Sequence, residues 1–296
     1  MTPTPIADVI DTCVIGHVTR DIVLGPDGQI RSQTGGAAYY AATALARLGL
    51  GVHLITRLAP ADQDLLTELR DLGIRVTVKA SAKTTVFEIG ADGSAKPVSI
   101  ASAFEPGDLD GVSARAVVMD PLTSHDRFAA FLEAAAKTAP VVALDLQGFV
   151  RKFLIPGVPQ EKVAAALPGL RHITIAKATL VEASAITGQS TPVAAARALA
   201  EMGPREVIVS FGIEGSLLLR DGKIHAIPAV QPSQRMSITG AGDSYLAGYV
   251  AARLEGTEPK EAAQFGAALA SLKIARSGAF DGSKADVAAL LARQGG

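Results

Sequence analysis

The sequence contains a single cysteine, Cys13, and no tryptophan. One cysteine cannot form an intramolecular disulfide or a cysteine-based zinc cluster, and this usage is typical of a reducing compartment. An excess of charge of one sign is also missing, because 28 basic residues balance 29 acidic ones for a formal net charge of -1. The composition therefore gives no indication of a nucleic acid or an anionic membrane as partner.

Long hydrophobic segments are missing as well. No apolar run reaches the length of a membrane span, and Asp8 and Asp11 lie where a signal peptide has a positive flank and an uninterrupted apolar stretch. We therefore expect a cytoplasmic protein with no membrane contact. The chain is nevertheless long and apolar, since 296 residues with 48% hydrophobic content can bury a large core.

Short β-branched runs alternate with alanine-rich amphipathic stretches, which predicts parallel βαβ units. A further Asp-Gly pair at residues 221–222 predicts a hairpin at the edge of the resulting sheet. The expected strands cover residues 9–15, 52–56, 117–119, 141–146, 173–175 and 207–210. The expected helices cover residues 38–48, 62–72, 127–137, 192–202 and 245–254.

Two segments interrupt this alternation, residues 20–33 and 84–100, each with Asp-Gly between alternating apolar residues. Asp-Gly in that setting is a hairpin signal, so we expect antiparallel strands that protrude from the α/β body. Because no Pro/Gly-rich linker separates two domains, residues 1–296 are expected to form one domain with a lid at about 16–36 and 81–102. Exposed edges of the lid strands favour a homodimer that pairs through the lid.

A glycine-rich bend, SITGAGDSY at residues 237–245, leads into apolar residues at helical spacing. Backbone N–H groups without side chains at a helix N-terminus form a cradle for an anion such as phosphate. Asp243 in the first turn suits a general base that takes a proton from an attacking hydroxyl. Taken alone, the bend fits slightly better with an ordinary helix start whose acid is favoured by the helix dipole.

Three motifs together resemble the ribokinase-like carbohydrate kinases, the phosphofructokinase B family. They are GGAAYYAATALARLG (35–49), SFGIEGSLL (210–218) and TGAGDSYLAG (239–248), in the order and spacing of that family. The resemblance implies an α/β fold, with a three-layer α/β/α body, a mainly parallel central sheet and a small β-strand lid. It also implies a kinase that uses ATP with Mg²⁺ to phosphorylate a hydroxyl of a sugar, polyol or nucleoside.

The resemblance also assigns roles to individual positions. Asp243 would be the catalytic base, and Gly240, Ala241 and Gly242 would form the anion hole. Asp21 matches an aspartate that binds substrate hydroxyls, although a solvated charge at a strand end is the alternative. The implied diglycine hinge between lid and body is Gly35 and Gly36, and the implied nucleotide-binding residues are Lys177, Ser210, Gly212, Gly215 and Thr239.

Departures from the family pattern are informative. Tyr40 stands where many members have an asparagine, and it either contacts the substrate or packs under the lid. Thr179 replaces the asparagine of a magnesium-linked motif whose Glu182 remains, so Glu182 would act on Mg²⁺ through water or be a solvated helix residue. Ser237 replaces an aspartate linked to a monovalent cation, so the sequence gives no support for a potassium requirement.

Residues 143–151, ALDLQGFVR, bear on the substrate. Gln147 and Arg151 correspond to polar substrate-binding positions of the family, and Arg151 has a surface ion pair as its alternative. Together with Tyr40 and Thr179, this segment resembles the inositol-kinase and archaeal-type nucleoside-kinase branches more than ribokinase proper. A sugar- or nucleoside-binding protein with weak or no catalysis on the same fold is the alternative function.

Overall fold

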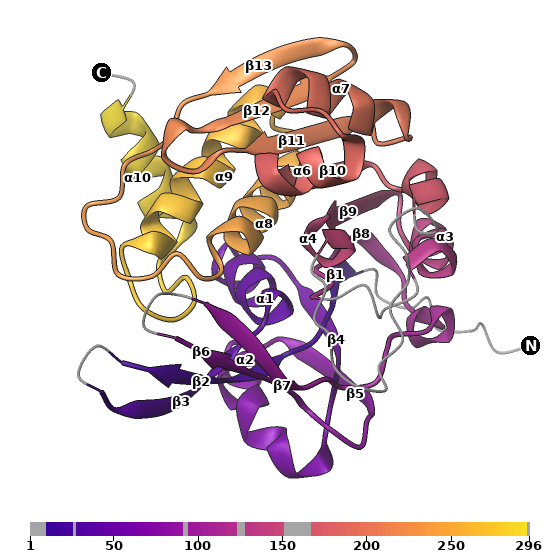
Figure 1. Cartoon of the computed structure of the whole chain (residues 1–296), viewed down its shortest axis with the longest axis vertical. Coiled ribbons are helices and arrows are strands. Elements are labelled where there is room, and N and C mark those ends of the chain that lie inside the picture. Colours follow the sequence, from indigo (N-terminus) through magenta and orange to yellow (C-terminus); the bar gives the residue numbers. More distant parts are fainter. Residues whose placement is uncertain (1–9, 26–27, 91–93, 123–127, 151–166, 295–296) are drawn as a thin grey trace, which may run out of the picture.

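The computed structural model describes residues 10–25, 28–90, 94–122, 128–150 and 167–294. Its large sheet follows the order β13-β12-β11-β10-β9-β8-β1-β4-β5 (Figure 1). Its strand pairs are parallel except for β11-β12 and β12-β13 at one end of the sheet, which are antiparallel. The bounds of its strands are β1 (Ile10–Ile15), β4 (Val52–Leu58), β5 (Arg75–Ala80), β8 (Ala114–Met119), β9 (Val141–Asp145), β10 (Ile175–Thr179), β11 (Glu206–Ser210), β12 (Ser216–Arg220) and β13 (Lys223–Ile227).

Helices cover both faces of this sheet, so the body has the expected three layers (Figure 1). Alternate strand residues point to opposite layers: Val14 of β1 packs in one core, whereas Cys13 and Ile15 pack in the other. The helices are α1 (Ala37–Arg47), α2 (Thr67–Asp71), α3 (Phe128–Thr138), α4 (Gln147–Val150), α6 (Leu180–Thr187), α7 (Pro192–Glu201), α8 (Ala241–Leu254), α9 (Pro259–Ile274) and α10 (Lys284–Gln294). Helices α1, α8 and α9 contribute to the first core, and α3 and α7 to the second.

A separate four-stranded sheet corresponds to the predicted lid (Figure 1). It consists of β2 (Thr19–Leu24), β3 (Ile30–Gly35), β6 (Thr85–Ile89) and β7 (Ala95–Ser99), in the order β3-β2-β6-β7. Both expected antiparallel hairpins, β2-β3 and β6-β7, are present, and β2 pairs with β6 in parallel. The edge strand β3 carries Ile30, which is 72% exposed, but the homodimer through this sheet stays a prediction.

The expected elements are present with shifted bounds, and three of the shifts bear on the site and its surroundings. In place of one helix at residues 62–72, the chain forms a 3₁₀ helix, Pro60–Leu66, followed by α2. Asp62 has non-helical φ and ψ, and its carboxylate accepts hydrogen bonds from Arg20 and Thr84. Helix α8 begins at Ala241 rather than at residue 245, directly after Gly240. Strand β10 runs over Ile175–Thr179 rather than 173–175, and it carries Lys177 as a buried strand residue.

The hairpin predicted at residues 221–222 is confirmed, since β12 and β13 pair in antiparallel at one edge of the large sheet. Within the part of the chain that the structure describes, no helix combines the length and apolarity that a membrane crossing requires. The predicted cytoplasmic location stays a prediction.

A buried carboxylate ties this sheet edge to α8. Glu206 of β11 is 4% exposed at its side chain, and it accepts hydrogen bonds from Tyr249 Oη at 2.5 Å and Arg253 Nη2 at 2.9 Å. Arg220 of β12 forms a further ion pair with it. Glu206 therefore connects two strands with the helix that carries Asp243.

We expect Glu206→Ala to lower the free energy of unfolding by about 3 kcal/mol, because it leaves two guanidinium groups and a buried hydroxyl without their acceptor. Urea unfolding followed by circular dichroism measures this loss. Glu201→Ala, at an exposed position of α7, is the matched control and should change the stability by less than about 0.5 kcal/mol. Equal unfolding midpoints for Glu206→Ala and the unmodified protein would contradict the assigned role.

Candidate active site

Two cavities adjoin each other at the carboxyl ends of the central strands, where open α/β sheets bind ligands. The polar cavity has a volume of about 400 Å³, and its lining includes Asp21, Tyr40, Gln147, Glu182 and Asp243. The apolar cavity has a volume of about 360 Å³, and its lining includes Ile213, Val230, Ala267 and Ile274. The residues that line both cavities are Lys177, Thr179, Ile238 and Gly242.

The N-terminus of α8 lies where the two cavities meet. Gly240 has a φ of 79°, and a Cβ there would lie 2.3 Å from the Tyr40 ring. A Cβ on Gly242 would lie 2.7 Å from Lys177 Nζ. Both positions therefore require glycine, the first also because left-handed backbone is costly for other residues.

One N–H group of the predicted anion hole, that of Ala241, is already hydrogen-bonded within the protein. The N–H of Ala241 donates to the carbonyl oxygen of Ile238 at 3.1 Å. The N–H group of Gly242 belongs to the first turn of α8, where the helix itself supplies no acceptor. This group and the positive end of the helix dipole favour an anion at the junction of the two cavities.

Asp243 is a buried carboxylate at this helix start, with 8% of its surface exposed. Its Oδ1 accepts a hydrogen bond from Gln147 Nε2 at 3.0 Å, and the backbone N–H of Gln147 donates to Asp145 Oδ1 at 3.1 Å. An amide donor and a helix N-terminus both stabilise the ionised form of a carboxyl group. Gln147, predicted to bind substrate, thus lines the polar cavity and also orients Asp243.

Asp145 and Lys177 form a buried ion pair beneath the junction of the cavities. The distance from Lys177 Nζ to Asp145 Oδ2 is 2.5 Å, and both side chains are less than 5% exposed. Burial lowers the pKa of Lys177, but the carboxylate of Asp145, together with those of Glu182 and Asp243, outweighs burial and raises it. Lys177 therefore carries a fixed positive charge at a position that lines both cavities.

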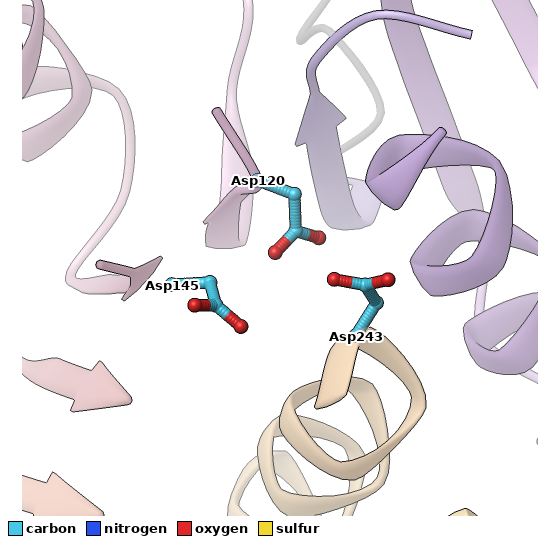
Figure 2. Close-up of side chains that lie close together, drawn as sticks. All are labelled: Asp120, Asp145 and Asp243. Carbon is cyan, nitrogen blue, oxygen red and sulfur yellow. The ribbon is translucent and has the colours of Figure 1, made fainter. Parts of the chain in front are cut away.

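A third carboxyl group, which the sequence analysis missed, completes this cluster. Asp120 follows β8, is fully buried, and has no hydrogen-bond partner for either carboxyl oxygen among the described residues. Figure 2 shows the carboxyl groups of Asp120, Asp145 and Asp243 converging, and one oxygen from each lies within 4.8 Å of the others. Burial, then Asp243 and Asp145, raise the pKa of Asp120 well above its usual range, with Lys177 opposing. Burial and the two neighbouring carboxyl groups thus favour the protonated form of Asp120.

At the lid end of the polar cavity, Asp21 of β2 is 4% exposed and accepts a hydrogen bond from Thr19 Oγ1 at 2.7 Å. Burial raises its pKa, and the Thr19 bond opposes the rise. The alternative of a solvated charge is therefore wrong. A Cβ on Gly35 would lie 2.0 Å from Asp21 Oδ2, so Gly35 makes room for this carboxyl group. Gly36 has a φ of 93°, and a Cβ there would lie 2.3 Å from the carbonyl oxygen of His17.

Tyr40 is a buried residue that also lines the polar cavity, and its contact with a substrate stays a prediction. Its ring is 2% exposed, packs against Gly240, and contacts the Tyr39 ring edge-on at a centroid distance of 5.2 Å. Burial, followed by the charges of Asp21 and Asp243, raises the pKa of Tyr40. Tyr40 thus supports the glycine loop from below while it lines the polar cavity.

Glu182 and Thr179 form a capping box at the start of α6. The N–H of Thr179 donates to Glu182 Oε2 at 2.7 Å, and the N–H of Glu182 donates to Thr179 Oγ1 at 3.2 Å. Glu182 is half-buried and lines the polar cavity, so it is not merely a solvated helix residue. Its action on Mg²⁺ stays a prediction.

The predicted nucleotide-binding residues divide between the cavities. Thr239 lines the polar cavity instead of the apolar one. Arg151 lies outside the described residues. The predicted residues that line the apolar cavity are Lys177, Ser210, Gly212 and Gly215.

Comparisons with known proteins agree on one family. The model of the pfkB family carbohydrate kinases matches residues 9–286. A cytidine kinase of Thermococcus kodakarensis is 26% identical over 274 residues, which cover 87% of this chain and 94% of that protein. A nucleoside kinase of Methanothermobacter thermautotrophicus is 44% identical over 84 residues, which cover 27% of this chain and 25% of that protein.

Solved structures show the same fold. A pyrophosphate-dependent kinase in the ribokinase family, complexed with a pyrophosphate analog and myo-inositol, has a TM-score of 0.82 at 23% identity and covers 94% of this chain and 99% of its own. Arabidopsis thaliana ribokinase complexed with ribose and ATP has a TM-score of 0.75 at 22% identity and covers 96% of this chain and 99% of its own.

The raised pKa of Asp120 has a consequence for stability. In the unfolded chain, Asp120 releases its proton above about pH 4, whereas its raised pKa keeps the proton bound in the folded protein to a higher pH. The free energy of unfolding therefore falls as the pH rises from about 4 to the folded pKa of Asp120. Asp120→Asn removes this loss. We expect the melting temperature of the variant, relative to that of the unmodified protein, to rise by a few degrees between pH 5 and pH 8, measured by calorimetry.

Asp71→Asn, at an exposed position of α2, is the control for this pH series. This substitution removes an exposed carboxylate instead of a buried one. The melting temperature of the variant should therefore follow that of the unmodified protein at every pH. Parallel curves for Asp120→Asn and the unmodified protein would contradict a raised pKa at Asp120.

Proposed function

The chain belongs to the pfkB family of carbohydrate kinases, and on that premise we propose that it transfers the terminal phosphoryl group of ATP to a hydroxyl of a small polyol, sugar or nucleoside. One observation carries the proposal. A polar cavity and an apolar cavity adjoin at Gly242 and Lys177, and Asp243 faces the polar one. This arrangement suits an acceptor on one side, a donor on the other and a base at the junction.

Within the polar cavity, Asp21 and Asp243 are the carboxylates that would contact the acceptor. A carboxylate can accept hydrogen bonds from two hydroxyl groups at once, as a ribose or a polyol offers. Phe87 and Leu122 line the same cavity and give a planar base an apolar surface. We propose a nucleoside as the acceptor, a choice supported by the relative named cytidine kinase, and myo-inositol as the principal comparison.

In the proposed reaction Asp243 accepts the proton of the acceptor hydroxyl. The freed oxygen then bonds to the terminal phosphorus of ATP, and the bond from that phosphorus to the bridging oxygen breaks, so that ADP leaves with the electron pair. The N–H groups of the first turn of α8 stabilise the negative charge on the transferred group. Gln147 keeps Asp243 aimed at the hydroxyl throughout.

The apolar cavity supports ATP as donor rather than pyrophosphate. Side chains such as Val230, Ala267 and Ile274 suit a nucleobase, and pyrophosphate has no group that would fill a space of about 360 Å³ with this lining. A nucleobase binds there by burying apolar surface, and the phosphates then extend towards Lys177 and the start of α8.

The residues near the junction fit a hydrated Mg²⁺, which keeps several waters and takes few protein ligands. Glu182 lines the polar cavity, and only its Oε2 is engaged by the cap of α6. Glu182 would hold the ion through water, and bound Mg²⁺ would offset the negative charge of the donor phosphates. Ser237 in place of a carboxylate gives no support for a potassium requirement.

The test is a phosphotransfer assay with ATP or pyrophosphate against cytidine, other nucleosides, ribose and myo-inositol, with the product detected by mass spectrometry. We expect transfer from ATP, and we expect Asp243→Asn to lower kcat by about 1,000-fold with a much smaller change in KM, because the base acts in the transition state. Asp221→Asn, at the exposed β12-β13 turn, is the control and should keep full activity.

Each alternative gives a different result. Transfer from pyrophosphate alone would refute ATP as the donor. Equal kcat for Asp243→Asn and the unmodified protein would refute Asp243 as the base. Tight binding of a nucleoside or polyol without any transfer would support the binding-protein alternative instead.

A further inference from the structure

A lysine lies buried behind the glycine loop. Lys273, in the last turn of α9, is 1% exposed. Its Nζ donates a hydrogen bond to the carbonyl oxygen of Ser237 at 3.2 Å and lies 5.4 Å from the centroid of the Tyr40 ring. Within the described part of the chain, this ammonium group forms no ion pair with a carboxylate.

Lys273 contacts two groups that flank the glycine loop, the Ser237 carbonyl before it and the Tyr40 ring beneath Gly240. Before the loop, the N–H groups of Met236 and Ser237 donate to the carbonyl oxygen of Ile274 at 2.9 and 3.3 Å, so this segment is fixed to the end of α9. Beneath the loop, the Tyr40 ring packs against Gly240, where a Cβ would lie 2.3 Å away. A positive charge at Lys273 therefore holds both Ser237 and the ring on which Gly240 rests.

The charge itself is costly to bury. Burial lowers the pKa of Lys273 to about 8, and the negative charge of Asp243 opposes the fall. The groups that face the ammonium are Asp243 from α8, the Tyr40 ring from α1, and the Ser237 carbonyl. A buried ammonium without an ion-pair partner does not favour stability, so a role in function accounts better for its position.

We propose that Lys273 is a positioning residue, a built-in cation that holds residues 237–240 in the shape that presents the N-terminus of α8 to the transferred phosphoryl group. The inference rests on the proposed kinase function. An ammonium group and a monovalent metal ion offer backbone carbonyls the same unit charge. Because the chain supplies this charge itself, phosphoryl transfer proceeds without potassium or sodium.

The experiment measures kcat and KM of the unmodified protein, Lys273→Met and Lys273→Arg from pH 6.5 to 9.5, in potassium, sodium or tetramethylammonium chloride. Lys260→Met, at an exposed position of the same helix, is the matched control. We expect the unmodified protein to keep its kcat within about twofold in all three salts. Its kcat should fall as the pH rises through about 8, because Lys273 then loses its charge.

Lys273→Met should lose kcat by about 100-fold with little change in the KM of the acceptor and should lack the fall near pH 8. It should regain part of its kcat in potassium chloride but not in tetramethylammonium chloride. Lys273→Arg, which stays charged, should keep activity and show no fall near pH 8. Full kcat and an unchanged pH profile in Lys273→Met, or a potassium requirement of the unmodified protein, would overturn the proposal. If Lys273→Met fails to fold, the salt series and Lys273→Arg decide.

A failure of the proposed function is distinguishable from a failure of this inference. If the unmodified protein transfers no phosphoryl group to any acceptor, the kinase function fails, and the role of Lys273 is then tested by calorimetric titration with ATP and Mg²⁺. Weaker binding by about tenfold in Lys273→Met at pH 7 supports the built-in cation. Equal binding by Lys273→Met and the unmodified protein refutes it.

Discussion

The close approach of three buried carboxyl groups is the constraint on which the rest of the site depends. Oxygens of Asp120, Asp145 and Asp243 lie within 4.8 Å of one another, a separation at which three buried negative charges would repel strongly. Lys177 offsets the charge of Asp145 through an ion pair, and the raised pKa of Asp120 favours its neutral form. Asp243 accepts a hydrogen bond from Gln147 at the N-terminus of α8, and both of these features favour a carboxylate.

The fold places these groups by simple topology. Asp120 and Asp145 follow or end adjacent parallel strands, β8 and β9, so they lie at the same edge of the sheet. Helix α8 then directs its N-terminus at this edge, and glycine at position 242 lets the helix approach Lys177 closely. A glycine has the same effect at the lid, where the missing side chain of Gly35 leaves space for the buried carboxyl group of Asp21.

Much of this was predictable from sequence, for local reasons. Glycine-rich turns, Asp-Gly hairpins and apolar alternation predicted the two sheets. Motif resemblance selected Asp21 and Asp243 as candidates, and both line the polar cavity. Contacts between distant segments were not predictable, such as Gln147 with Asp243 or Lys273 with Ser237. The position of Asp120 directly after the apolar run 117–119 indicates an acid at the end of a strand. Nothing in the local sequence, however, distinguishes a buried acid at that position from an exposed one.

Difference infrared spectroscopy of the protein at pH 7 tests the central claim most directly, since a protonated carboxyl group and a carboxylate absorb at distinct frequencies. The account predicts that Asp120→Asn removes the band of a protonated carboxyl group. It also predicts that Asp243→Asn removes the band of a carboxylate and leaves the protonated one in place. Loss of the protonated band in Asp243→Asn, with its retention in Asp120→Asn, would contradict the account.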